Sequence, residues 1–69
     1  MSFHTCPVSG CVHQVDNARL MCAVHWRLVS KRTQREVYTA WERLQRARTP
    51  ENATAHRQAC ERAIREASR

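Results

Sequence analysis

The two short stretches Cys6-Pro-Val-Ser-Gly-Cys11 and Cys22-Ala-Val-His25 decide the fold of this chain. Together they follow the pattern C-x4-C-x10-C-x2-H. A tetrahedral zinc ion needs four nitrogen or sulfur donors, usually in two close pairs that each bend the chain around the metal. The proline and glycine permit a tight knuckle in the first stretch, and the i,i+3 spacing of the second brings both donors to one face of a helical turn. The pattern predicts one structural Zn²⁺, held by Cys6, Cys11, Cys22 and His25.

A chain of this size needs stabilisation beyond that of its apolar core. It has 69 residues, with only one Phe, one Tyr and two Trp. A core of this size is expected to supply ~3–5 kcal/mol, whereas a structural zinc contributes roughly 10–16 kcal/mol in zinc-finger peptides. The single Gly and the two Pro leave little room for tight β-hairpins. We therefore expect residues 1–69 to form a single domain that depends on the metal.

The cysteines allow two other interpretations, disulfide bonds and burial as small apolar side chains. No apolar run approaches the ~18 residues of a membrane span, and the N-terminus lacks a secretory pattern. The chain is therefore expected in the cytoplasm and not in a membrane, and reduced thiols there act more often as ligands. His4 and His13 flank the knuckle, and either could replace one ligand. For His56 and Cys60, on an apolar helical face, packing is the expected role.

Three segments follow from the composition of the chain: a Cys/His zinc head over 1–26, a basic segment over 27–48 and an alanine-rich helix over 50–68. Because almost no linker separates the last two, they are expected to form an antiparallel αα-hairpin. The expected fold is small and mainly α-helical, with a zinc-stapled N-terminal knuckle followed by this hairpin. Its predicted core comprises Trp26, Leu28, Val37, Trp41, Leu44 and Ile64.

Local signals mark where both helices begin. Apolar residues at helical spacing predict an amphipathic helix over 31–48. Ser30 precedes it as an N-cap, because its hydroxyl can accept a hydrogen bond from the first turn. Thr49 is the predicted N-cap of the second helix, with Pro50 at its first position and an acidic residue next.

Positive charge is concentrated on one face of the helix over 31–48. The chain carries twelve Lys plus Arg against six Asp plus Glu, a formal charge of +6. Arginine suits both phosphate and carboxylate partners, although such a face can also be merely solvated. We expect it to bind nucleic acid or an acidic protein surface, and the alanine-rich helix offers a face for an oligomer. The basic residues are Lys31, Arg32, Arg35, Arg43 and Arg46.

An enzymatic function is not expected. A catalytic zinc keeps an open coordination position and works with a general base. Four ligands are predicted here, and the head contains one carboxylate, that of Asp16. The H-x-E and P-C-x-x-C motifs of zinc deaminases are both missing. The predicted zinc is therefore interpreted as structural.

The segment Met21-Cys22-Ala-Val-His25-Trp26, together with the Cys6/Cys11 loop and the basic helix, resembles a group of short phage- and prophage-encoded zinc-binding proteins. These have a C-x4-C loop and an M-C-x-x-H-W segment before two helices. This chain departs from them at Ser30, where such relatives tend to have proline. The resemblance implies an accessory role in the host cytoplasm, on DNA or on a host protein, including host takeover or inhibition of host defence. It implies no enzymatic activity.

Overall fold

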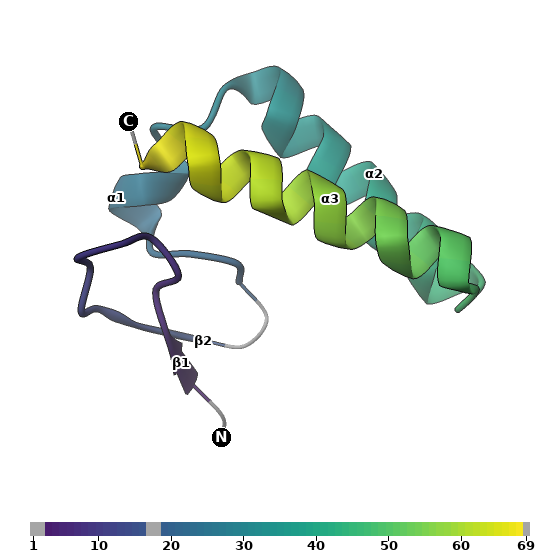
Figure 1. Cartoon of the computed structure of the whole chain (residues 1–69), viewed down its shortest axis with the longest axis horizontal. Coiled ribbons are helices and arrows are strands. Elements are labelled where there is room, and N and C mark those ends of the chain that lie inside the picture. The colour runs from purple at the N-terminus through teal and green to yellow at the C-terminus, as the bar shows by residue number, and fades with distance from the viewer. Residues whose placement is uncertain (1–2, 17–18, 69) are drawn as a thin grey trace.

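The N-terminal part of the chain is a small sheet joined to a one-turn helix, and the rest is two long helices (Figure 1). The computed structural model describes residues 3–16 and 19–68. Strands β1 (Phe3–Thr5) and β2 (Gln14–Asp16) pair antiparallel, with His4 opposite Val15. Sequence analysis did not predict these strands. The loop 6–13, not a tight turn, joins them, and the N–H of Cys6 donates to the carbonyl of His13 over 2.8 Å.

Helix α1 (Ala23–Trp26) leads into α2 (Lys31–Arg46) and then into α3 (Pro50–Ala67). Both predicted N-caps are confirmed, because the Ser30 side chain accepts from the N–H of Thr33 and the Thr49 side chain accepts from the N–H of Asn52. Pro50 occupies the first turn of α3, as predicted.

Helix α2 ends two residues before the predicted boundary at 48, because Ala47 adopts an extended conformation. The Asn52 side-chain amide donates to the carbonyls of Arg43 (3.3 Å) and Ala47 (2.7 Å). The same carbonyls also accept from backbone groups, that of Arg43 from the N–H of Ala47 (2.9 Å) and that of Ala47 from the N–H of Thr49 (3.0 Å). A side chain from the start of α3 thus adds a second donor to each carbonyl and caps the end of α2.

Contacts at both ends relate α2 and α3 as antiparallel neighbours, and the two helices lie side by side in Figure 1. The Asn52 amide joins the end of α2 to the start of α3. At the opposite ends, the Glu66 carboxylate accepts from the N–H of Ser30 (2.9 Å) and from the hydroxyl of Thr33. Thr33 is buried, so this carboxylate satisfies a polar side chain within the helix interface.

The predicted core is only partly correct. Val37 is buried, but Leu28 and Trp41 are 57% and 47% exposed, and the other three predicted residues are half-buried. Leu28 lies in the turn between α1 and α2, and Trp41 lies beside His56 of α3, whereas alanines, with Ala63 fully buried, form the buried positions of α3. The buried apolar residues are Cys6, Val8, Val15, Met21, Val29, Val37, Ala40, Ala59, Ala63 and Ala67.

Some of the alanines of α3, which the sequence offers as an oligomer interface, are instead buried within a single copy of the chain. Ala59, Ala63 and Ala67 are buried, whereas Ala53 and Ala55 near the start of α3 are exposed. None of the helices in the described part of the chain is long and apolar enough to cross a membrane.

The Glu66 carboxylate provides a test of the helix interface. Glu66→Ala is expected to lower the free energy of unfolding by about 1–3 kcal/mol, because it removes two hydrogen bonds to a charged acceptor and leaves the Thr33 hydroxyl without that partner. The matched control is Glu61→Ala, which removes only an exposed ion pair with Arg57. Chemical denaturation of both variants measures the difference, and equal stability would contradict this account of the interface.

Candidate metal centre

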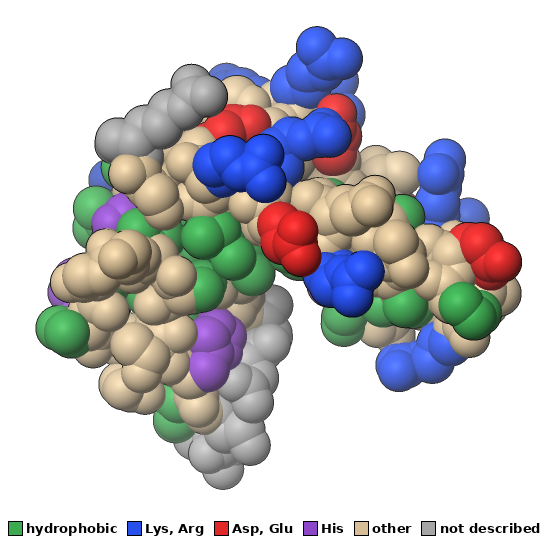
Figure 2. All heavy atoms as spheres, in the orientation of Figure 1, with side chains coloured by type: hydrophobic (Ala, Val, Ile, Leu, Met, Phe, Trp, Pro, Cys, Tyr) green, Lys and Arg blue, Asp and Glu red, His purple; other side chains and the backbone are tan. Residues whose placement is uncertain are grey.

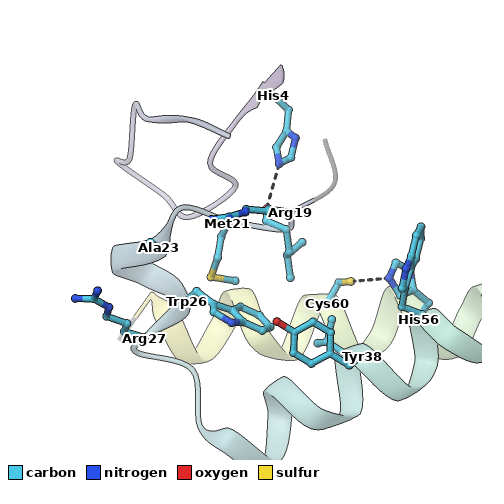
Figure 3. A pocket seen from close by; sticks show the side chains of 12 residues that line it. His4, Arg19, Met21, Ala23, Trp26, Arg27, Tyr38, His56 and Cys60 are labelled. Atoms are coloured by element: carbon cyan, nitrogen blue, oxygen red, sulfur yellow. Dashed lines mark hydrogen bonds between the residues drawn. The ribbon is translucent and has the colours of Figure 1, made fainter. Parts of the chain in front are cut away.

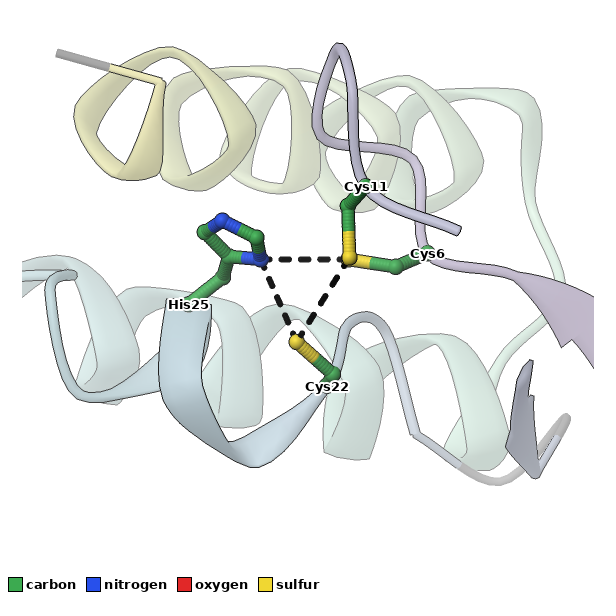
Figure 4. A group of neighbouring side chains, drawn as sticks. All are labelled: Cys6, Cys11, Cys22 and His25. Atoms are coloured by element: carbon green, nitrogen blue, oxygen red, sulfur yellow. Dashed lines mark hydrogen bonds between the residues drawn. The ribbon is translucent and has the colours of Figure 1, made fainter. Parts of the chain in front are cut away.

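Four side chains of the N-terminal part converge on one point (Figure 4). Cys6 follows β1, Cys11 closes the loop, Cys22 precedes α1, and His25 lies within that helix. Their Sγ and Nδ1 atoms all lie within 4.8 Å of one another, so the group could hold one metal ion. The structure thus brings together all four residues that the Cys/His spacing predicts as ligands.

Three of the six separations between donors are close to the edges of a tetrahedron around a metal ion. The Sγ of Cys11 and that of Cys22 are 3.9 Å apart, and the Nδ1 of His25 lies 3.6 Å from the Sγ of Cys6 and 3.2 Å from that of Cys22. Bonds of about 2.3 Å to sulfur and about 2.0 Å to nitrogen give tetrahedral edges of about 3.8 Å between sulfurs and about 3.5 Å between sulfur and nitrogen. The donors therefore surround a space of the right size for one ion.

The first donor pair depends on a sharp bend of the backbone. The N–H of Cys11 donates to the carbonyl of Val8 over 3.0 Å, and Gly10 adopts a φ of 84°. A Cβ at Gly10 would meet no atom within 4 Å, so the requirement for glycine is conformational rather than steric. Buried Val8 anchors the loop from inside. The bend directs the Cys6 and Cys11 thiols toward the same point.

The second donor pair is positioned by a helical turn. The N–H of Trp26 donates to the carbonyl of Cys22 over 2.9 Å, which starts α1 and places His25 one turn after the cysteine. The segment before it is held from two directions. Met21 is buried, and the ring Nε2–H of His4 donates to the carbonyl of Leu20 over 3.1 Å. The sheet thus helps to hold the second pair near the first.

The thiols of the first pair differ in acidity. Burial raises the pKa of the Cys6 thiol, but hydrogen bonds from the N–H groups of Cys22 and Val8, together with those to the side chains of Cys11 and His25, outweigh burial, and the pKa falls to about 6. At Cys11 the N–H of His13 lowers the pKa, while burial and the neighbouring thiols of Cys6 and Cys22 raise it, and the net shift is upward. Cys6 is therefore the more readily deprotonated donor of the pair. Thiolates are the form in which cysteines bind metal.

The remaining predicted candidates lie outside the four-donor group. His13 has its Nδ1 3.4 Å from the Sγ of Cys11 but does not belong to the converging set, and neither does His4. All four cysteines are free thiols. Cys60 contacts the Nε2 of His56 at 3.5 Å, and burial, with the charge of Glu61, raises its pKa. A raised pKa makes Cys60 a poor nucleophile, as its expected packing role implies.

The basic face, defined as Lys31, Arg32, Arg35, Arg43 and Arg46, is exposed along α2. Arg32 pairs with Glu36 at 3.7 Å, and Glu36 also pairs with Arg62 of α3. Within residues 3–16 and 19–68, the other four members form no ion pair. Figure 2 shows Lys and Arg side chains gathered over the helical part of the molecule rather than over the head.

Sequence analysis missed a second feature, a groove between the head and the long helices with a volume of about 590 Å³ (Figure 3). Its walls include Trp26, Tyr38 and Trp41. Both tryptophans were predicted as core residues, and Trp41 shares the apolar face of the helix predicted over 31–48. Their exposure depends on the distance between elements, which no local pattern encodes.

Comparison with protein-family models, with curated proteins and with solved structures finds no match for this chain. The relation to phage zinc-binding proteins therefore stays a prediction from the Cys/His/Trp pattern.

The metal centre is tested by comparing two cysteine substitutions. Cys22→Ser is expected to weaken Zn²⁺ binding by more than the 10- to 100-fold typical of losing a residue that only supports a ligand, because it removes a donor directly. Cys60→Ser is the matched control and should bind one equivalent like the unaltered protein. Competition with a chromophoric chelator measures both affinities. Equal zinc affinity of the two variants would exclude Cys22 as a ligand.

Proposed function

We propose that this chain is a non-enzymatic zinc-binding protein that binds nucleic acid through the basic face of α2. Zinc is the metal we assign to the Cys6, Cys11, Cys22 and His25 group. The observation that carries this assignment is the convergence of three thiols and one imidazole within 4.8 Å of one another, with three of their separations close to tetrahedral edges. Sulfur and imidazole donors in a tetrahedral array favour zinc over magnesium, calcium or manganese.

The zinc would have a structural role. Four protein donors complete a tetrahedral coordination, which leaves no position for water or substrate. Apart from the metal, the head has two three-residue strands and a one-turn helix to stabilise it. Elements this short are not stable alone in water. The role of the four ligands is therefore to hold the head together and to fix α1 ahead of α2. Thiol ligands of this kind also favour a reducing, cytoplasmic environment.

Support for nucleic-acid binding comes from the cations of α2 that form no ion pair. Lys31, Arg35, Arg43 and Arg46 are exposed, and the described part of the chain supplies no carboxylate within 4 Å of them. Cations on one side of a rigid helix can contact successive phosphates and release counterions, which gives sequence-independent affinity. We expect phosphate contacts to dominate, because no base-reading pattern is evident among these residues.

An acidic protein surface is the second candidate partner. Three of the four cations that form no ion pair are arginines, and a guanidinium group pairs as well with a carboxylate as with a phosphate. In that case the protein would act as a modulator of its partner, and the phage resemblance would make the partner a host protein. Binding that survives nuclease treatment would distinguish this candidate.

Removal of zinc tests the structural role. Treatment of the reduced protein with a strong chelator is expected to abolish the dispersed amide signals of residues 3–16 and 19–26 and to lower the helical circular dichroism signal, because folding and metal binding are coupled. Adding one equivalent of Zn²⁺ should restore both signals. An unchanged spectrum in metal-free protein would contradict a structural zinc.

Salt dependence and charge neutralisation test nucleic-acid binding. With four phosphate contacts, the affinity for duplex DNA is expected to fall about 100-fold between 50 and 200 mM salt. The double variant Arg35→Gln/Arg46→Gln should bind more weakly and lower the slope of log affinity against log salt by about two. The matched control Arg57→Gln/Arg65→Gln has the same net charge but changes α3, and it should bind like the unaltered protein. Equal loss in both double variants would mean that net charge, not the face of α2, determines binding.

A further inference from the structure

The groove between the head and the two long helices is walled by aromatic rings from different elements (Figure 3). Trp26 of α1 and Tyr38 of α2 make an edge-to-face contact, with ring centroids 5.7 Å apart. Trp41 of α2 and His56 of α3 form a tilted pair at 5.4 Å. Two aromatic pairs therefore stand along one groove, and each pair joins two elements of the fold.

These rings are available to a partner. Tyr38 is 57% exposed and Trp41 is nearly half exposed, although the chain has few large apolar side chains with which to build a core. An edge-to-face contact uses the edge of one ring and one face of the other, so it covers only one of the four faces of the Trp26–Tyr38 pair. Exposed aromatic side chains gathered in a concave surface are typical of binding sites rather than of a solvated surface.

The electrostatic character of the groove favours an anionic partner. The residues that line it include two arginines and two histidines and no Asp or Glu. Arg19 comes from the segment after the sheet, and Arg27 directly follows α1. In Figure 3 the guanidinium group of Arg27 extends away from the rings, toward the outside of the groove. Arg27 therefore lies at the rim of the groove and not against the rings.

The groove is continuous with the basic face. Tyr38 lies three positions after Arg35 on α2 and three before Trp41, and residues at this spacing are neighbours on a helix surface. Lys31 and Arg35 are likewise adjacent, four positions apart. One helix thus carries two aromatic rings beside Lys31 and Arg35, which form no ion pair within the described residues, with the exposed carboxylate of Glu42 four positions after Tyr38.

We propose that this groove binds a short stretch of single-stranded nucleic acid, with unpaired bases stacked on Tyr38 and Trp41 and the phosphates on the adjoining cations. The inference rests on the proposed nucleic-acid binding and specifies its substrate. Proteins that bind single strands without sequence preference combine a positively charged groove with aromatic stacking platforms. Both components occur here on neighbouring positions of α2.

Two considerations favour a single strand over the other anionic partners. In a duplex the bases are stacked and paired inside the helix, so their faces cannot reach rings that line a groove between elements. An acidic peptide with aromatic side chains could also contact the rings and the cations. It would need a particular sequence in which aromatic and acidic residues alternate. A single strand has a flat base and a phosphate in every unit, which matches the two rings and the cations beside them.

The first test uses the tryptophans of the unaltered, zinc-loaded protein. Both tryptophans of the chain line the groove, so intrinsic fluorescence reports directly on this surface. An oligothymidylate of about ten nucleotides is expected to quench this fluorescence and to bind more tightly than a duplex of equal length. Quenching by an acidic aromatic peptide, with none by the oligothymidylate, would overturn the inference in favour of a protein partner.

The second test compares aromatic substitutions. Tyr38→Ala and Trp41→Ala are each expected to weaken oligothymidylate binding by about 5- to 150-fold, which is the loss of one stacked base, with duplex affinity unchanged. Phe3→Ala is the matched control, because Phe3 is similarly exposed but lies on β1 outside the groove. Fluorescence anisotropy of labelled oligonucleotides measures these affinities, and thermal unfolding confirms that the variants fold.

The results separate this inference from the function on which it rests. If oligothymidylate and duplex bind equally, and the groove variants behave like Phe3→Ala, the groove is not the site, while salt-dependent binding through the basic face stands. If no nucleic acid binds even at low salt, the proposed function itself is wrong. A selective loss of single-strand affinity in Tyr38→Ala and Trp41→Ala supports both.

Discussion

The convergence of Cys6, Cys11, Cys22 and His25 is the constraint on which the rest of the head depends. The paired strands are three residues long and α1 is a single turn, so hydrogen bonding within these elements cannot hold them in place. The buried apolar side chains of the head are few. An ion bound by four donors would cross-link the loop 6–13 to the start of α1, and it would do so with far more free energy than the small apolar core can supply.

Helices α2 and α3 pack against each other without the metal donors. Small side chains form the buried positions of α3. Ala59, Ala63 and Ala67 form the buried face of α3, and polar contacts mark both ends of the interface. The aromatic rings of α2 lie at the margin of this interface. Trp41 contacts His56 of α3, and Tyr38 and Trp41 both line the groove between α2 and the head.

Stability and the proposed binding would therefore depend on different groups. The proposed zinc and the alanine interface stabilise the fold, whereas the cations of α2 contribute little to it, because only Arg32 among them is paired within the described part of the chain. Glu36 bridges Arg32 and Arg62 and leaves the rest of the basic face available. Such a division allows the charged and aromatic residues of α2 to be substituted with small effects on folding, which makes their role in binding separable by experiment.

The sequence by itself determined the features that depend on residues close together in the chain. The spacing of cysteines and histidine identified the four donors, and Ser30, Thr49 and Pro50 marked the helix starts, because capping and ligand pairing act over a few residues. Only the tertiary structure decided features that join distant segments. The strand pairing, the Asn52 amide that caps the end of α2, the Glu66 carboxylate on Thr33 and the exposure of Leu28 and Trp41 are of this kind. Each depends on how closely the elements approach, and that distance is set by the packing of side chains far apart in the chain.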